Sequence, residues 1–204
     1  MRLCMRLIVP LPFCFALAVG PLAAQGQAWG VAFEIGLTRF WGGSEPAPPT
    51  EAPGFKPYRP TTLGVRVDHQ VGRARLAIGA LYAPSGLGAE SDELAVIAKG
   101  GLNWVQVAPE VAYRLGTIGP VAEVSLFAGP VFDFWMLSDE AGRIRVGGRG
   151  GLELLLPLGS GLAGTLRAHG GVTGSLFRDA DVPGDFRTKA MPNAGVALGL
   201  RVGL

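Results

Sequence analysis

The chain contains very little cysteine and very little lysine. Among its 204 residues the cysteines are Cys4 and Cys14, and the lysines are Lys56, Lys99 and Lys189. Both cysteines lie in an N-terminal segment that has the features of a secretory signal peptide. Once that segment is removed, no disulfide, thiolate metal ligand or redox-active thiol is expected in the mature chain.

Residues 1–24 begin with the basic residues Arg2 and Arg6, continue with an apolar run and end in small residues. This pattern is typical of a secretory signal peptide, and the run is short for a membrane-spanning helix. We therefore expect residues 25–204 to form the single mature domain, with an uncleaved anchor or a lipoprotein attached at Cys14 as alternatives. Cleavage would remove two of 18 basic residues and leave 16 against 16 acidic ones, which does not favour nucleic-acid binding.

Long apolar runs are absent after the signal, and alternation takes their place. No later segment has the ~18 consecutive apolar residues of a membrane-spanning helix. Eight segments instead alternate apolar residues with small or charged ones, a period of two that predicts strands with two unlike faces. These segments cover residues 29–41, 61–70, 73–84, 102–115, 120–135, 144–157, 162–176 and 193–204.

The connections between these strands alternate in length. Short turns are expected at Val71-Gly72, Ile118-Gly119 and Gly159–Gly161, and long connections at residues 42–60, 85–101, 136–143 and 177–192. The proline-rich stretch 42–54 is expected to lack regular structure, and residues 91–98 fit either a short helix or an extended strand. Short turns at one end and long loops at the other are typical of outer-membrane barrels, whose short turns lie in the periplasm.

The scarcity of lysine indicates which face points outwards. A soluble barrel is apolar inside and polar outside, whereas a membrane barrel is the reverse. A soluble outer face would carry many lysines, but all three lysines here lie in long connections. The sequence therefore predicts an all-β, eight-stranded antiparallel up-and-down transmembrane barrel. Aromatic residues near strand ends are expected to form its interfacial girdles: Trp29, Trp41, Tyr82, Tyr113, Phe134 and Trp135.

The chain resembles the small eight-stranded bacterial outer-membrane barrels of the OmpA/OmpX type over residues 28–204. Gly199, Val202 and Leu204 in the last strand resemble the signal that the barrel-assembly machinery reads, although the final residue is Leu204 rather than an aromatic one and Ala197 replaces a polar residue. The resemblance implies an outer-membrane location, contact with outer-membrane lipids, and the assembly machinery as a partner during insertion.

The polar face predicts an ion-pair network inside the barrel, because a buried charge must be paired. Its expected members are Glu34, Arg66, Asp68, Arg75, Glu110, Arg114, Glu123, Glu153, Arg167 and Arg201. Pairing across the short hairpins sets Asp68 opposite Arg75, Arg114 opposite Glu123, and Glu153 opposite Arg167.

Five of these side chains are expected at one height, where they would block the lumen: Glu34, Arg66, Glu110, Glu153 and Arg167. Loss of Arg167 is then expected to destabilise the barrel, and removal of its partner Glu153 to restore part of that loss.

The pattern indicates a non-enzymatic barrel with a structural or surface-interaction role. The alternatives are a narrow channel for small solutes and an enzyme that modifies lipid A. His169 and Ser175 share the inner face but lie roughly 20 Å apart along a strand, too far for a base and a nucleophile. The glycine-rich stretch 147–151 does not lie between a strand and a helix, so it does not predict a phosphate loop. No cofactor, metal or nucleic-acid partner is expected, and the sequence identifies no surface partner.

Overall fold

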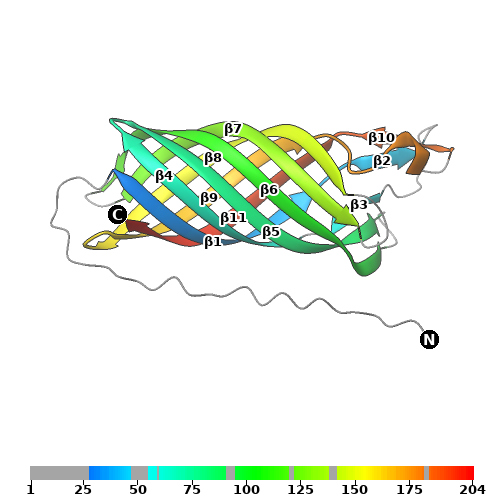
Figure 1. The fold of residues 1–204 in the computed structure, drawn as a ribbon, viewed down its shortest axis with the longest axis horizontal. Coiled ribbons are helices and arrows are strands. Elements are labelled where there is room, and N and C mark those ends of the chain that lie inside the picture. Colours follow the sequence, from blue (N-terminus) through cyan, green and yellow to red (C-terminus); the bar gives the residue numbers. More distant parts are fainter. Residues whose placement is uncertain are drawn as a thin grey trace.

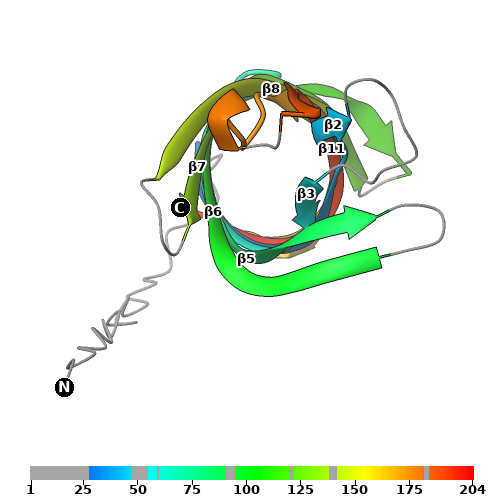
Figure 2. The same cartoon turned by 90° about the vertical axis from the view of Figure 1, so that its right-hand side faces the viewer.

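The computed structural model describes residues 28–46, 55–58, 60–90, 95–119, 122–137, 142–181 and 184–204. Eight antiparallel strands close into a barrel, because each pairs with the next along the chain and the last pairs with the first (Figures 1 and 2). The strands are β1 (Trp29–Phe40), β4 (Thr61–Val71), β5 (Ala74–Glu90), β6 (Ala95–Ile118), β7 (Ala122–Leu137), β8 (Arg143–Gly159), β9 (Leu162–Thr173) and β11 (Met191–Gly203). The predicted eight-stranded up-and-down barrel is confirmed.

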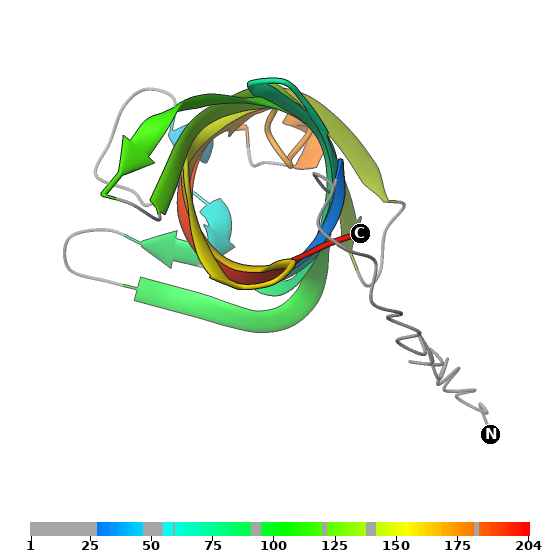
Figure 3. The ribbon, with the colours of Figure 1, turned by 90° about the vertical axis from the view of Figure 1, so that its left-hand side faces the viewer.

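The short connections gather at one end of the barrel, which we call the turn end (Figure 3). Gly72 and Arg73 form a two-residue turn in which Gly72 has a φ of 61°. A positive φ suits the tight hairpin turns that match strand twist, and glycine adopts it without steric cost. This turn makes Val71 face Ala74 and so fixes the register of β4 against β5.

The opposite end, called the loop end, carries additional structure. β2 (Gly43–Pro46) pairs with β10 (Phe186–Lys189), β3 (Phe55–Tyr58) pairs with the far part of β5, and Asp179–Asp181 forms the short 3-10 helix η1. The expectation that residues 42–54 lack regular structure is therefore wrong for β2, which gains its hydrogen bonds from β10. Residues 47–54 lie outside the described part of the chain.

Two of the strands are longer than expected. β5 continues to Glu90 and β6 begins at Ala95, so most of the predicted connection 85–101 is strand. Residues 91–98 fit either a helix or a strand by sequence, and residues 95–98 prove to be the first part of β6. Residues 91–94 lie outside the described part of the chain. The two strands stay paired past the barrel wall, with a register shift between Ser85 and Leu87.

The two faces of the wall differ as the alternation predicts. Large apolar side chains cover the outer surface, where Leu37 is 59% and Leu198 61% exposed, whereas Arg66 on the inner face is 2% exposed. Trp29, Trp41, Tyr82 and Tyr113 are exposed on the outside. A membrane-spanning helix is absent from the described residues.

The placement of Trp135 in an outer girdle is wrong. This side chain is fully buried inside the barrel. It lies two residues after Asp133 on β7, and alternate residues of a strand share a face. Phe134 has the opposite parity and is half-buried.

Candidate functional site: the barrel interior

The middle of the barrel is crossed by a cluster of ion pairs, which we call the central layer. Its members come from six strands that meet only because the barrel closes: Glu34 on β1, Arg66 on β4, Arg75 on β5, Glu110 on β6, Arg149 and Glu153 on β8, and Arg167 on β9. The five residues predicted to share one height all belong to it.

Glu153 is the acceptor shared by three arginines. Its Oε2 lies 2.8 Å from Arg66 Nη2 and 3.1 Å from Arg167 Nε. Its Oε1 accepts a hydrogen bond from Arg75. The predicted pairing of Glu153 with Arg167 across the hairpin is confirmed, since the two residues face each other in β8 and β9. With 1% of its side chain exposed, Glu153 has little water to replace a lost partner.

Arg167 joins all three glutamates of the layer. Besides its contact with Glu153, its Nη2 lies 2.5 Å from Glu110 Oε1 and its Nη1 lies 3.4 Å from Glu34 Oε2. The guanidinium carbon is 4.0 Å from the centre of the Phe127 ring. This cation–π contact adds to the ion pairs and fixes the guanidinium in the lumen.

Arg149 connects the central layer to the loop end. Its Nη2 lies 3.0 Å from Glu110 Oε2, and its Nη1 donates to Gln106 Oε1 at 2.6 Å. The amide of Gln106 donates in turn to Asp133 Oδ1 at 2.7 Å, which also accepts from Trp104 Nε1 at 2.8 Å. The sequence prediction of the network did not include Arg149 and Asp133. Alternation within their strands places both side chains on the inner face and could have indicated them.

Asp68 and Arg201 form a second group nearer the turn end. Arg201 donates to both carboxylate oxygens, with Nη2 at 2.5 Å from Oδ1 and Nε at 3.0 Å from Oδ2. Such forked pairs are among the strongest charge-assisted contacts. Gly30 provides the room, because a Cβ there would collide with the Arg201 guanidinium.

Two of the three predicted cross-strand pairings are wrong in register. Asp68 faces Ala77 and Arg75 faces Gln70, because the turn residues are Gly72 and Arg73 rather than Val71 and Gly72.

Arg114, similarly, faces Ser125 instead of Glu123. The register of β6 against β7 shifts between Arg114 and Gly116. The two charged side chains still meet diagonally near the turn end, with Arg114 Nη1 3.4 Å from Glu123 Oε2.

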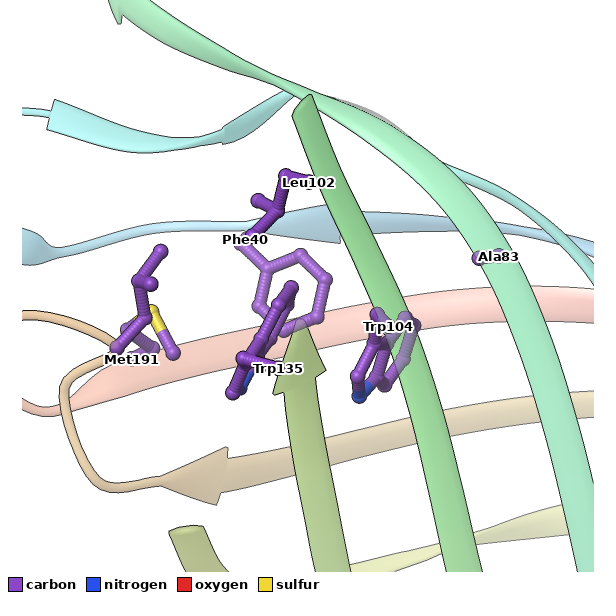
Figure 4. Packing of buried hydrophobic residues seen from close by; sticks show 7 residues of the cluster. Phe40, Ala83, Leu102, Trp104, Trp135 and Met191 are labelled. Carbon is purple, nitrogen blue, oxygen red and sulfur yellow. The ribbon is translucent and has the colours of Figure 1, made fainter. Parts of the chain in front are cut away.

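A buried aromatic cluster lies inside the barrel at the loop end (Figure 4). Trp104 and Trp135 stack with their rings 5.4 Å apart, and Phe40 meets both edge-on at 5.0 and 5.6 Å. The remaining buried members are Ala83, Leu102, Leu176 and Met191.

Leu176 reaches this cluster from the segment between β9 and β10. Arg143 Nη1 donates to the carbonyl of Leu176 at 2.8 Å and also lies 2.6 Å from Asp181. The arginine therefore fixes a connecting segment over the mouth of the barrel.

Outside the wall, Glu45 on β2 binds two cations of β10. Lys189 Nζ and Arg187 Nη2 each lie 2.5 Å from one of its carboxylate oxygens. The hydrogen bond from Lys189, helped by Arg187, lowers the pKa of the Glu45 carboxyl below its ordinary value. The carboxylate therefore stays charged to a lower pH than an isolated glutamate does, which favours its two contacts with β10.

The histidine and serine weighed as an enzymatic pair have other contacts. Ser175 donates to the carbonyl of Gly43 at 2.6 Å. The His169 ring lies against Gly195, where a Cβ would be 2.7 Å from its Cε1. Among the described residues, no group of three histidine, cysteine, aspartate or glutamate side chains is arranged to hold a metal.

In the last strand, β11, Gly199 faces the barrel interior and Leu204 is exposed on the outside. Gly199 faces Glu34, and a Cβ at this position would be 2.6 Å from Thr165 Oγ1 and 2.9 Å from Glu34 Cγ. Gly199 therefore leaves space for the central layer. Leu204 is 66% exposed, and its amide donates to the carbonyl of Trp29 at 2.9 Å. The assembly role of Gly199, Val202 and Leu204 stays a prediction.

Leu204→Asp tests that role. The mutant is expected to be depleted from the outer membrane, because a charge at the strand terminus disrupts recognition, whereas its cost in stability near an interface is only about 0–1 kcal/mol. Immunoblotting of membrane fractions measures the depletion. Leu158→Asp is the control, since Leu158 is also exposed, at 59%, and lies near the turn end of β8. Equal membrane levels of the two mutants would contradict the signal.

This chain resembles known proteins in fold rather than in sequence. No family model and no curated protein matches it. Neisserial surface protein A (NspA) matches with a TM-score of 0.54 at 10% identity, over 87% of this chain and 97% of that chain. A major outer membrane protein from Thermus thermophilus matches with a TM-score of 0.49 at 14% identity, over 86% and 99% of the two chains. At such identities the likeness to NspA concerns the fold alone, and the chain has the fold of small eight-stranded outer-membrane barrels.

Proposed function

We propose that the protein is an integral barrel of an outer membrane, with the turn end in the periplasm and the loop end outside the cell. The observation that carries this proposal is the distribution of side chains on the barrel wall, which is apolar outside and charged inside. Side chains such as Ile35, Leu152 and Leu198 are more than half exposed on the outer surface, while the arginines of the central layer are buried inside. Water would penalise this arrangement, whereas lipid favours it, and a closed barrel leaves no unpaired edge in lipid.

We infer a non-enzymatic role that depends on the surface of the barrel and not on transport through it. Two features support this role: the central layer and the aromatic cluster each cross the lumen. At the loop end, β2 with β10 and β3 with β5 continue beyond the barrel wall (Figure 1). These extensions would present a structured surface outside the cell. NspA, which shares the fold, is described as a surface protein.

Membrane fractionation together with heat-modifiable gel migration tests the location. The folded barrel is expected in the outer-membrane fraction and to migrate differently before and after boiling. Recovery of the mature chain in the soluble periplasm would overturn the proposal.

Planar-bilayer recording and mass spectrometry of lipid A test the role. We expect little or no conductance from the purified barrel, and lipid A that is unchanged by expression of the protein. A steady, large conductance would favour the narrow channel, and a changed acylation pattern would favour an enzyme.

A further inference from the structure

The central layer borders a partly open cavity of about 30 Å³. It lies between the inner sides of β4 and β5 and the arginines that cross the lumen, with Arg66, Arg149, Arg167, Glu34 and Gln106 in its lining. A cavity of roughly 10–15 Å³ is enough to hold one water molecule. The cavity therefore has room for one or two particles of the size of water or a halide ion.

The charged groups around this cavity do not balance. Three guanidinium groups and one carboxylate line it. The central layer as a whole contains four arginines (Arg66, Arg75, Arg149 and Arg167) and three glutamates (Glu34, Glu110 and Glu153). Across the whole interior the charges balance, because Arg201 pairs with Asp68 and the buried carboxylate of Asp133 lies beyond Gln106. The excess of positive charge is therefore confined to the cavity itself, where three guanidinium groups face one carboxylate.

The hydrogen-bonding groups left over at the cavity are donors. Arg66 is 2% exposed, and its Nη1 has no hydrogen-bond partner among the described residues; the same holds for Arg149 Nε. A buried donor without a partner costs about 1–3 kcal/mol.

The acceptors of the lining are already engaged. The two oxygens of Glu34 pair with Arg66 Nε and Arg167 Nη1, and Gln106 Oε1 accepts from Arg149. A water molecule would find donors to bind but few acceptors for its own hydrogens. An anion needs donors only.

We propose that this cavity is a binding site for one small monovalent anion, with chloride as its ordinary occupant. The ion lies against the three guanidinium groups of the lining and accepts from the unpartnered guanidinium nitrogens. The size of the cavity excludes phosphate, sulfate and organic acids. The site concerns the interior alone, so it stands or falls independently of the proposed surface role.

Glycine keeps the cavity open, and this provides a test. Gly64 and Gly79 lie in its lining without side chains. A Cβ at position 79 would lie 3.7 Å from Arg149 Nη2 and 3.9 Å from Arg66 Cβ, both ordinary contacts. Gly79→Ala should therefore fold normally while its methyl group occupies part of the anion's space. Gly170→Ala is the matched control, because Gly170 is exposed and a Cβ there would only approach Asn193 O at 3.7 Å.

The experiment measures urea unfolding of the refolded barrel in neutral detergent, in sodium chloride, bromide or gluconate at one ionic strength. An anion that binds the folded state alone raises the unfolding midpoint in a saturable way. We expect such a shift with chloride and bromide for the wild type and for Gly170→Ala, and its loss in Gly79→Ala. Equal midpoints in all three salts, or an undiminished shift in Gly79→Ala, would overturn the proposal.

Diffraction from crystals grown in bromide gives a second measurement that needs no variant. An anomalous peak between Arg66 and Arg149 is expected. A cavity without that peak would show that water alone occupies it, which contradicts the proposal even if Gly79→Ala does not fold.

Discussion

Glu153→Gln is expected to lower the free energy of unfolding by about 3–5 kcal/mol, the cost of removing one partner from a buried ion pair. Arg66, Arg75 and Arg167 all share this carboxylate. The substitution keeps the size of the side chain and one acceptor oxygen but removes its charge. The central layer would then hold four arginines against two glutamates, in a place where little water reaches them.

Urea unfolding in detergent micelles, followed by tryptophan fluorescence, measures this effect. Glu123→Gln is the matched control, since its partner Arg114 is 45% exposed and such pairs contribute about 0–1 kcal/mol. Equal losses in the two variants would mean that water screens the interior and that the layer is a lined pore.

The structure changes what a double substitution should do. If Glu153 and Arg167 bound only each other, Glu153→Ala would restore part of the stability that Arg167→Ala removes. Glu153 also pairs with Arg66 and Arg75, and Arg167 also pairs with Glu34 and Glu110. In the Arg167→Ala variant Glu153 still binds Arg66 and Arg75, and its removal takes from Arg75 the carboxylate that it binds in this layer. The second change is therefore expected to add to the loss.

Local patterns predicted the features of this molecule that depend on a single strand. Alternation assigns Leu198 to the outer face and Arg167 to the inner face, because the side-chain period of a strand is two whatever its neighbours are. Counting residues from the short turns also brought Glu34, Glu110 and Glu153 to one height, since all three strands have one end at the turn end.

Features that depend on two strands were harder to predict. When a turn is placed one residue too early, every expected pairing partner is wrong by two residues. For this reason the sequence predicts Arg75 opposite Asp68, where the structure has Ala77. The turn between β6 and β7 is misplaced in the same way, because Ile118, expected in the turn, pairs with Ala122 in the sheet. The further register shift after Arg114 leaves no mark in the alternation. Contacts across the lumen, such as Arg75 with Glu153, depend on how the barrel closes and on the reach of long side chains, and no local pattern records either.

The aromatic cluster shows a further limit. Tryptophans near strand ends are typical of membrane interfaces, which predicts an outer position for Trp135. Its parity within β7 predicts the opposite, because alternate residues place Trp135 on the same inner face as Asp133. Trp104 has the same parity as Gln106 and belongs inside by the same argument. Parity within the strand was the better guide at both positions.

Trp135→Ala is the second substitution with a large expected effect. Trp135 is fully buried, stacks on Trp104 and contacts the edge of Phe40. Truncation of a buried tryptophan costs about 3–5 kcal/mol, because transfer energy is lost and a cavity remains. We expect a loss of this size in urea unfolding. Trp41→Ala is the control: Trp41 is 40% exposed and contacts Arg39, an exposed cation–π pair worth about 0.5–1 kcal/mol.

Conductance separates the stability of the aromatic cluster from its part in closing the lumen. We propose that the lumen is blocked twice along its length, by the aromatic cluster at the loop end and by the central layer in the middle. Trp135→Ala is therefore expected to be less stable but to stay non-conducting in planar bilayers. The central layer still crosses the lumen in this variant, because its ion pairs involve no residue of the cluster. Steady conductance from Trp135→Ala alone would mean that water passes the arginines and that the aromatic cluster is the only barrier.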